Sequence, residues 1–383
     1  MKKKVIFMLI NMNVGGTEKA LLNMTAEMPT ADYDITILML EKYGGFLGSI
    51  PSHVHVEYLQ EYPAIKEELN KPPKTAALNL INRGKFGKGI AFSIIVLLSK
   101  LTKNKSIFFR YLLKNVPELK NEYDVAIAYA GPMDFISYFV AMKIKAKERV
   151  QWIHFDITKV GFDNRFAARI YKQFDKIFVV SKEGKKKFIN LFPQFEDKVE
   201  SFPNKMSREL VLKMADEGPG FEDNFNGVRI LTVGRLSKEK GQDLAIRALA
   251  KLKKAGFNVR WYCVGEGSAR AEYQGLIKEY EVENEFILLG ATPNPYPFMR
   301  QCDIYVQPSR HEGYCITLAE AKCFNKPIVS TDFTGAREQL KDGEIGIIVK
   351  YDENQMIRTL QQIISDETIR ELFHKRLQRG KLS

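Results

Sequence analysis

The chain has 383 residues, 45% of them hydrophobic and 27% charged, which excludes a wholly disordered protein and is typical of two globular domains. Its four cysteines include no C-x-x-C pair, so they offer neither a disulfide scaffold nor a zinc site, and we expect reduced thiols in the cytoplasm. The net charge is +12, and residues 71–120 hold eleven Lys or Arg residues against one acid, Glu118. This concentration favours an anionic partner: a membrane face, a nucleic acid or a phosphorylated substrate.

The first half of the chain alternates short apolar runs with segments of helical spacing. Continuous apolar runs of this length are typical of strands buried on both faces of a parallel sheet. The first run follows three lysines as in a signal peptide, but it is short and lacks a small-residue cleavage site, so we interpret it as a strand. The expected strands are Val5–Ile10, Ile35–Leu40, His53–Leu59, Val125–Tyr129, Val150–Ile153 and Ile177–Val180, and the first expected helix is Thr17–Met28.

Residues 205–227 interrupt this alternation with glycines, a proline and several acids, which indicates a linker. The alternation then restarts, so we predict an α/β protein of two Rossmann-like, doubly wound domains that face each other across a cleft. The predicted domains are residues 1–204 and 205–360, followed by a helical tail, 361–383, that packs back on the first domain. The later strands are expected at Val228–Val233, Val259–Val264, Phe286–Leu289, Ile304–Gln307, Pro327–Ser330 and Gly346–Val349, and the helices at Gly241–Lys254, Ala269–Tyr280, Pro295–Arg300, Thr317–Cys323 and Asn354–Arg379.

The densest chemical signal is the segment 309–321, which follows a strand and opens a helix. Glu312 precedes the helix and Glu320 lies inside it, eight positions later. The backbone N–H groups of Tyr314 to Thr317 would be unpaired donors at a helix N-terminus, which favours an anion. Two carboxylates around such a turn suggest recognition of a nucleotide-sugar. The alternative is that Glu312 only caps the helix and Glu320 lies on its surface.

Two further strand-to-helix turns carry polar groups. Val233–Gly241 presents Arg235 and Lys240, which could hold a diphosphate or could be solvated loop charges. Asn13–Lys19 includes Gly16, where backbone can approach a ligand closely, although the segment is not the G-x-G-x-x-G of a dinucleotide fold.

In combination, these segments resemble the family-4 retaining glycosyltransferases of the GT-B fold, of the bacterial surface polysaccharide type. The resemblance extends over essentially the whole chain and is strongest from Val228 to Gly346. The segments that carry it are Gly15–Glu18, Val179–Lys182, Pro203–Asn204, Val233–Gly241, Val264–Gly267, Cys302–Ile304, Glu312–Glu320 and Thr334–Glu338. Cys315 departs from the pattern, because many relatives have glycine or proline there.

The resemblance assigns roles to individual residues. It implies that Glu312 and His154 act at the transferred sugar, that Glu320 binds the ribose hydroxyls, and that Arg235 and Lys240 clamp the diphosphate. The remaining donor-binding groups that it implies are Gly16, Tyr314, Cys315, Ile316 and Thr317.

The resemblance also implies the reaction. The first domain would bind the acceptor, and the second would bind a nucleoside-diphosphate sugar, foremost a UDP-hexose. The sugar would pass to a hydroxyl of a lipid-linked glycan in cell-surface polysaccharide or capsule biosynthesis, with no metal and no cofactor. Two alternatives stay open: a non-enzymatic sugar-nucleotide or membrane-binding protein that keeps the fold, and a dinucleotide-dependent oxidoreductase.

The basic segment 71–120 interleaves apolar and aromatic residues with its cations. We expect it to contact an anionic membrane and to hold the protein, as a peripheral protein, on the inner face of the plasma membrane. Ordinary core helices with a solvated basic face are the alternative, and no nucleic-acid motif accompanies the segment. The candidate membrane residues are Lys100, Lys103, Lys105, Phe108 and Phe109.

Overall fold

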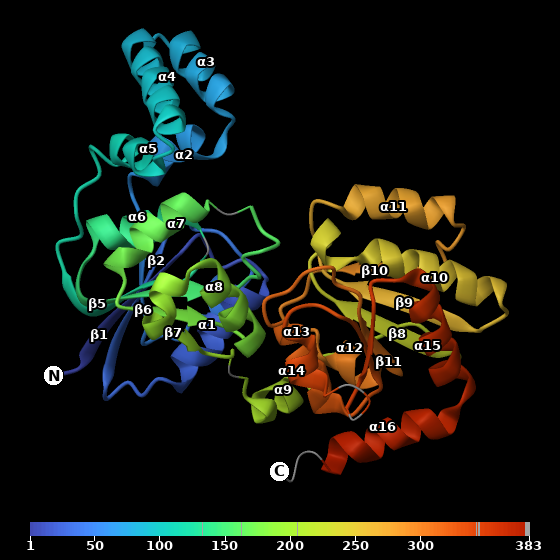
Figure 1. Cartoon of the computed structure of the whole chain (residues 1–383). Coiled ribbons are helices and arrows are strands. Elements are labelled where there is room, and N and C mark those ends of the chain that lie inside the picture. Colours follow the sequence, from blue (N-terminus) through green and yellow to red (C-terminus); the bar gives the residue numbers. More distant parts are fainter. Residues whose placement is uncertain (132, 162, 205, 342, 344, 380–383) are drawn as a thin grey trace. The chain divides into compact units, whose positions relative to one another are not determined.

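The computed structural model describes residues 1–131, 133–161, 163–204, 206–341, 343 and 345–379. The chain forms two compact units. The first contains residues 1–13, 24–179 and 185–202, and the second contains 14–23, 180–184 and 203–383. Each unit is built around one parallel sheet with helices packed on it, as Figure 1 shows for each unit.

The sheet of the first unit has the strand order β3-β2-β1-β4-β5-β6-β7, and all its pairs are parallel. Val5 of β1 pairs with Ile35 of β2 on one side and with Val125 of β4 on the other. These central strands are buried on both faces, which is why they read as continuous apolar runs. The strands are β1 (Lys3–Leu9), β2 (Tyr33–Met39), β3 (His55–Tyr58), β4 (Glu122–Ala128), β5 (Lys145–Ile153), β6 (Lys176–Val179) and β7 (Val199–Ser201).

The segment 71–120, which the sequence marks as basic, forms three of the helices between β3 and β4, namely α3 (Pro73–Asn82), α4 (Phe86–Leu101) and α5 (Lys105–Leu112). Figure 1 shows α3 and α4 lying side by side as a hairpin that stands out from the sheet of the first unit. Among the described residues, no helix is both long and apolar enough to cross a bilayer. The helices assigned to this half of the chain are α1 (Gly16–Glu27), α2 (Tyr62–Asn70), α3 (Pro73–Asn82), α4 (Phe86–Leu101), α5 (Lys105–Leu112), α6 (Asp134–Lys143), α7 (Asn164–Ile170) and α8 (Lys182–Leu191).

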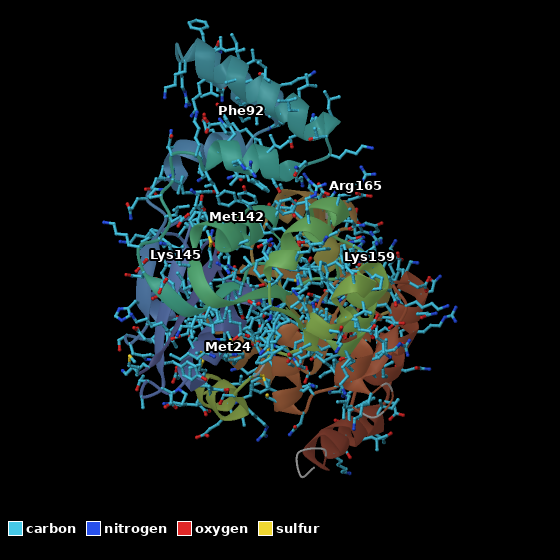
Figure 2. The ribbon with its side chains drawn as sticks, turned by 60° about the vertical axis from the view of Figure 1, so that its left-hand side comes forward. Met24, Phe92, Met142, Lys145, Lys159 and Arg165 are labelled. Carbon is cyan, nitrogen blue, oxygen red and sulfur yellow. The ribbon has the colours of Figure 1, made fainter. Side chains whose placement is uncertain are left out.

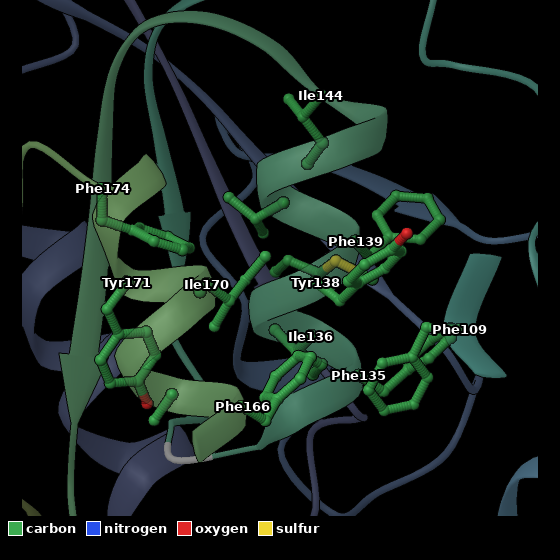
Figure 3. Close-up of a cluster of buried hydrophobic side chains, with 14 of the residues drawn as sticks. Phe109, Phe135, Ile136, Tyr138, Phe139, Ile144, Phe166, Ile170, Tyr171 and Phe174 are labelled. Carbon is green, nitrogen blue, oxygen red and sulfur yellow. The ribbon is translucent and has the colours of Figure 1, made fainter. Parts of the chain in front are cut away.

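Aromatic side chains from α5, α6 and α7 fill the core between these helices (Figure 3). Phe109 of α5 lies 5.8 Å from Phe135, 5.4 Å from Tyr138 and 5.4 Å from Phe166, measured between ring centroids. Contacts between aromatic rings stabilise the fold beyond the burial of their apolar surface. The apolar side of α5 is therefore packed against α6 and α7 of the first unit.

The sheet of the second unit has the order β10-β9-β8-β11-β12-β13, again with parallel pairs throughout. This order places β8 and β11 side by side at the centre, where the direction of strand succession reverses, and ligands of such sheets bind at that point. The predicted two Rossmann-like sheets are therefore confirmed. The strands are β8 (Val228–Val233), β9 (Val259–Val264), β10 (Phe286–Gly290), β11 (Ile304–Gln307), β12 (Ile328–Thr331) and β13 (Ile347–Val349).

The predicted linker and tail differ from expectation in detail. Residues 205–227 include a helix, α9, which is capped by the Ser207 side chain and buries Val211. The tail breaks at Asp366 into α15 and α16, and α16 packs on α15; its packing on the first domain stays a prediction. The helices are α9 (Arg208–Met214), α10 (Gln242–Lys254), α11 (Arg270–Glu279), α12 (Tyr296–Gln301), α13 (Ile316–Ala321), α14 (Ala336–Leu340), α15 (Glu353–Ser365) and α16 (Glu367–Arg379).

Candidate functional site

The turn after β8 positions two predicted cations. Arg235 is exposed and has no carboxylate within ion-pair distance among the described residues, although its charge lowers the pKa of Glu18 and of Glu239 from a longer range. Lys240 is followed by Gly241, whose φ is +71°. A side chain at position 241 would place Cβ 2.0 Å from the carbonyl oxygen of Pro308, so only glycine lets the two turns approach this closely. The turn after β8 therefore packs directly on the turn after β11.

The same packing joins Lys240 to Glu312. The Lys240 ammonium donates a hydrogen bond of 2.6 Å to Oε1 of Glu312, whose side chain is only 8% exposed. Burial would lower the pKa of Lys240, but the neighbouring Glu312 carboxylate raises that pKa above its ordinary value. The two residues, predicted for different parts of a donor, are thus a half-buried ion pair in the ligand-free chain.

A chain of buried hydrogen bonds connects Glu312 to the start of α13. Ser309 Oγ donates to Glu312 Oε1 at 2.9 Å, and Gln307 Nε2 donates to Ser309 Oγ at 2.9 Å. The hydroxyl of Thr317 donates in turn to Gln307 Oε1 at 3.2 Å. Gln307 and Ser309 are fully buried, so these bonds fix the positions of both Glu312 and Thr317.

Two contacts that the sequence did not reveal hold the loop between β11 and α13. Arg310 forms a two-pronged ion pair with Asp243 of α10, at 2.8 and 2.6 Å, and stacks on the Tyr351 ring. The side-chain amide of Gln339 donates to the backbone carbonyls of Tyr314 and Cys315. The partners lie 24 to 67 positions apart in the sequence, so no local pattern marks them.

Cys315 stands at the residue before α13 with φ of +62°, a left-handed conformation that favours glycine. Its thiol is buried and lies 3.4 Å from the Thr317 hydroxyl. Burial raises the pKa of this thiol, so it is protonated and unreactive at neutral pH.

Glu320 lies inside α13 and is 2% exposed. The hydroxyl of Tyr296, the first residue of α12, donates a 2.6 Å hydrogen bond to Glu320 Oε1. Burial raises the pKa of Glu320 to about 7, against the opposing effects of the Tyr296 hydrogen bond and the Lys19 charge. A surface position for Glu320, the alternative that the sequence allowed, is wrong.

Gly16 and His154 belong to different units. Gly16 begins α1 in the second unit, where a Cβ would lie 3.2 Å from the Ile316 side chain, so the glycine backbone approaches the start of α13. His154 follows β5 in the first unit, stacked 5.9 Å from Trp152 between ring centroids and 4.5 Å from Tyr129. Burial lowers the pKa of His154 to about 3, so its imidazole is neutral at physiological pH.

The candidate membrane residues differ in their burial and in their ion pairs. Phe109 is 4% exposed inside the aromatic core of Figure 3, so it is not the inserting side chain that the sequence suggested. Phe108 is partly buried against the same core, and its contact with a membrane stays a prediction. Lys105 donates a 2.6 Å hydrogen bond to Asp134 and lies 3.6 Å from Asp163, so its charge is paired with carboxylates of the first unit. Lys100 and Lys103 are exposed and have no ion-pair partner among the described residues.

Comparison with known proteins identifies the part of the chain that carries Arg235, Lys240, Glu312 and Glu320. Residues 222–380 match the protein family described as glycosyl transferases group 1. All four of these predicted donor-binding residues lie inside the matched region.

The chain is also similar to individual glycosyltransferases. One relative is the N-acetylgalactosamine-N,N'-diacetylbacillosaminyl-diphospho-undecaprenol 4-alpha-N-acetylgalactosaminyltransferase of Campylobacter jejuni. The two chains are 34% identical over 206 residues, and this aligned region covers 53% of this chain and 54% of the Campylobacter protein. This chain is also 28% identical over 149 residues to the capsular polysaccharide biosynthesis glycosyltransferase CapM of Staphylococcus aureus, covering 36% and 37% of the two chains. The matched region thus spans about half, or less, of these relatives.

The fold of the whole chain matches solved structures. Anabaena HepE, solved in complex with UDP-glucose, superposes with a TM-score of 0.71 at 17% identity and covers 98% of this chain and 93% of its own. At that identity the likeness concerns the fold, and the fold is the GT-B arrangement of two parallel sheets with helices. The fold that the resemblance implied is confirmed.

Proposed function

We propose that the chain transfers a hexose-type sugar from a UDP-sugar to a hydroxyl group of a lipid-linked glycan, with retention of the anomeric configuration. The observation that carries this proposal is the Lys240–Glu312 pair, which lies at the carboxyl ends of β8 and β11 inside the region that matches the group 1 glycosyl transferases. A carboxylate held by a cation, beside an unpaired Arg235, suits a ligand that combines a diphosphate with a polyhydroxyl sugar.

In this proposal each side chain binds a different part of the donor. Arg235 and Lys240 neutralise the diphosphate, and the first backbone N–H groups of α13, from Tyr314 to Thr317, hold its distal phosphate with Gly16 nearby. Glu320 accepts hydrogen bonds from the ribose hydroxyls. Glu312 accepts a hydrogen bond from a sugar hydroxyl once the donor draws Lys240 toward the diphosphate.

The chemical step is a displacement at the anomeric carbon. The bond from that carbon to the diphosphate oxygen breaks, and the electron pair leaves with the diphosphate, where Arg235 and Lys240 stabilise it. The acceptor hydroxyl forms the new bond on the same face, and its proton passes to the departing diphosphate oxygen. His154, as a neutral imidazole, can accept a hydrogen bond from the reacting sugar without adding positive charge. No carboxylate is assigned as a covalent nucleophile.

The class of acceptor and the place in the cell are inferred by analogy with the relatives. The Campylobacter enzyme is named for an undecaprenol-diphosphate-linked acceptor, and CapM is named for capsular polysaccharide biosynthesis. We infer the same class of acceptor, a glycan on a diphosphate-linked lipid, for cell-surface polysaccharide assembly. In this proposal residues 1–204 bind the acceptor and residues 205–360 bind the donor. The enzyme works at the inner face of the plasma membrane as a peripheral protein.

The proposal is tested by binding and by product analysis. The full chain is mixed with UDP, GDP, dTDP and their hexoses, and its unfolding temperature is measured; UDP and one UDP-hexose should raise it most. That UDP-hexose is then incubated with an undecaprenol-diphosphate-linked sugar, and the product linkage is assigned by NMR. An α-linked product from an α-linked donor is expected with or without EDTA, since no metal is assigned.

The two alternatives give different results in the same assays. A non-enzymatic protein would bind the nucleotide-sugar without forming product or hydrolysing the donor. An oxidoreductase would be stabilised by NAD or NADP and not by any nucleoside diphosphate. Loss of transfer in EDTA with recovery in manganese would overturn the metal-independent assignment while leaving the donor assignment intact.

A further inference from the structure

One face of α4 carries an exposed apolar stripe. Phe86, Ile90, Ile94, Leu97 and Leu101 are spaced four, four, three and four residues apart, so they lie along one side of the helix. Each is more than half exposed, from 51% for Ile94 to 70% for Leu101. Singly exposed apolar residues need no explanation, but a contiguous row of five over four helical turns marks an interaction surface.

The opposite face of α4 packs against the rest of the hairpin and α5. The exposed stripe is therefore not the face through which α4 packs on the protein. Phe92 is fully buried against the Phe108 ring, 5.9 Å away between centroids. Gly89 lies so close to α3 that a Cβ there would approach Ile81 to 2.7 Å. Figure 2 labels Phe92 on the hairpin, which stands clear of the sheet of the first unit.

Unpaired cations lie at both ends of the stripe. Lys85 precedes Phe86, while Lys100 and Lys103 flank Leu101, and all three are exposed. None of the three forms an ion pair with a described residue, in contrast with Lys88, which is held by Glu68 at 2.6 Å. An apolar row with lysines at its ends is complementary to a surface that is apolar inside and anionic at its border.

We propose that α4 of this hairpin is a membrane-docking helix that lies in the plane of an anionic bilayer, with the row from Phe86 to Leu101 among the acyl chains and Lys85, Lys100 and Lys103 on the head groups. The sixteen residues of α4 extend for about 24 Å, a length suited to lying on a bilayer. The inference rests on the proposed function, because a lipid-linked acceptor requires the enzyme to reach a membrane surface.

The charge on the hairpin favours a lipid surface over a second copy of the chain. A symmetric dimer through the stripe would bring two sets of Lys85, Lys100 and Lys103 together, and residues 71–117 contain no acid that could pair with them. An anionic bilayer presents the opposite charge and an apolar interior at the same time. We therefore commit to the bilayer, and a dimer is an outcome of the test.

Tryptophan placed in the stripe reports insertion directly. The chain has two tryptophans, Trp152 and Trp261, and both are buried, so they give a constant background. With vesicles of phosphatidylcholine containing one third phosphatidylglycerol, Ile94→Trp should shift its emission to the blue and be quenched by brominated acyl chains. Leu210→Trp, at an exposed position of α9, is the matched control and should show neither change.

Charge placed in the stripe should abolish docking without harming the fold. In vesicle sedimentation, Ile94→Glu and Leu97→Glu together should weaken the partition coefficient at least a hundredfold, whereas Leu210→Glu should leave it unchanged. Lys85→Glu, Lys100→Glu and Lys103→Glu together should remove only the part of binding that 0.5 M salt also removes. All variants should keep the parent's unfolding temperature and UDP affinity, because the altered residues are exposed and remote in sequence from the donor residues.

Three results would overturn the proposal. The stripe variants could sediment like the parent, or Ile94→Trp could remain solvent-exposed on anionic vesicles. Alternatively, sedimentation velocity without lipid could show a parent dimer that Leu97→Glu converts to a monomer, which would make the stripe a self-association surface. Failure of the proposed function is distinguishable, since it would appear as absent UDP binding or transfer in a protein that still docks on vesicles.

Discussion

Lys240 Nζ lies 2.6 Å from Glu312 Oε1, so the residue proposed for the diphosphate and the residue proposed for the sugar are partners before any donor binds. Donor binding must therefore exchange this ion pair for contacts with two parts of one ligand. The pair keeps a buried carboxylate compensated in the empty site, and it makes the contributions of the two residues to stability and to catalysis interdependent.

The first prediction is that substitutions of this pair are not additive. Lys240→Met leaves the Glu312 carboxylate buried without its cation, so it should lower the unfolding temperature more than Lys240→Met combined with Glu312→Gln. We expect a coupling free energy of about 1–3 kcal/mol. Urea unfolding of the four proteins measures it, with the exposed Lys238→Met as a surface control. Strictly additive free energies would show that the pair is not formed in solution.

The second prediction concerns Arg235, which is exposed and unpaired in the ligand-free chain. Arg235→Ala should leave the unfolding temperature unchanged but reduce kcat/KM for the donor about a hundredfold to a thousandfold, because the departing diphosphate loses a cation. Arg358 is an exposed arginine of α15, and Arg358→Ala is the control, which should change neither the unfolding temperature nor kcat/KM. Equal turnover in the two variants would remove Arg235 from the site.

The third prediction is that donor affinity depends on pH through Glu320. As a carboxylate it accepts from the ribose hydroxyls, and its pKa of about 7 means that affinity should fall as pH is lowered through 7. Tyr296→Phe removes a hydrogen bond that stabilises the carboxylate, so the midpoint should move to higher pH. Calorimetry with UDP-glucose, whose diphosphate does not titrate in this range, measures the profile, and Glu320→Gln should flatten it. A parent profile that is already flat between pH 6 and 8 would contradict this role.

The fourth prediction is that Glu320 costs stability at high pH. Its folded-state pKa is raised from 4.5 to about 7, so its stabilising contribution is complete below pH 4.5 and is lost as pH rises through 7. Glu320→Gln carries no such cost and should exceed the parent in unfolding free energy by roughly 3 kcal/mol at pH 8 and by less than about 1 kcal/mol at pH 5. Denaturant unfolding at the two pH values checks this, and an equal gap at both would be inconsistent with the raised pKa.

The fifth prediction compares two glycines of positive φ. Gly256 has φ of +84° and open space around it, so Gly256→Ala should cost about 1 kcal/mol from backbone strain alone. Gly241 has φ of +71°, and an added Cβ meets the Pro308 carbonyl, so Gly241→Ala should cost a further 1–3 kcal/mol. It should also reduce donor turnover by displacing the loop that carries Glu312. Similar losses of stability in the two variants would show that the turns do not pack as described.

Apolar runs and their spacing were sufficient to predict the two sheets. Val228–Val233 and Ile304–Gln307 were predicted to the residue, because strands buried on both faces must be continuously apolar and are bounded by turn residues. The same local logic placed Arg235, Lys240 and Glu312 at strand ends. Residues in β7 and α9 were missed, because three residues of strand and seven of helix are too short to show a period.

Tertiary structure decided which side chains meet and which reach water. Tyr296 and Glu320 lie 24 positions apart, and the hydrogen bond between them exists only because the fold brings the first residue of α12 to a side chain of α13. In the basic segment, Phe109 and Ile94 are both apolar residues of amphipathic helices, yet one is buried and the other exposed. Periodicity identifies an apolar face, but the neighbouring elements decide whether that face has a partner; α5 has the aromatic core of the first unit, and the outer face of α4 has none among the described residues.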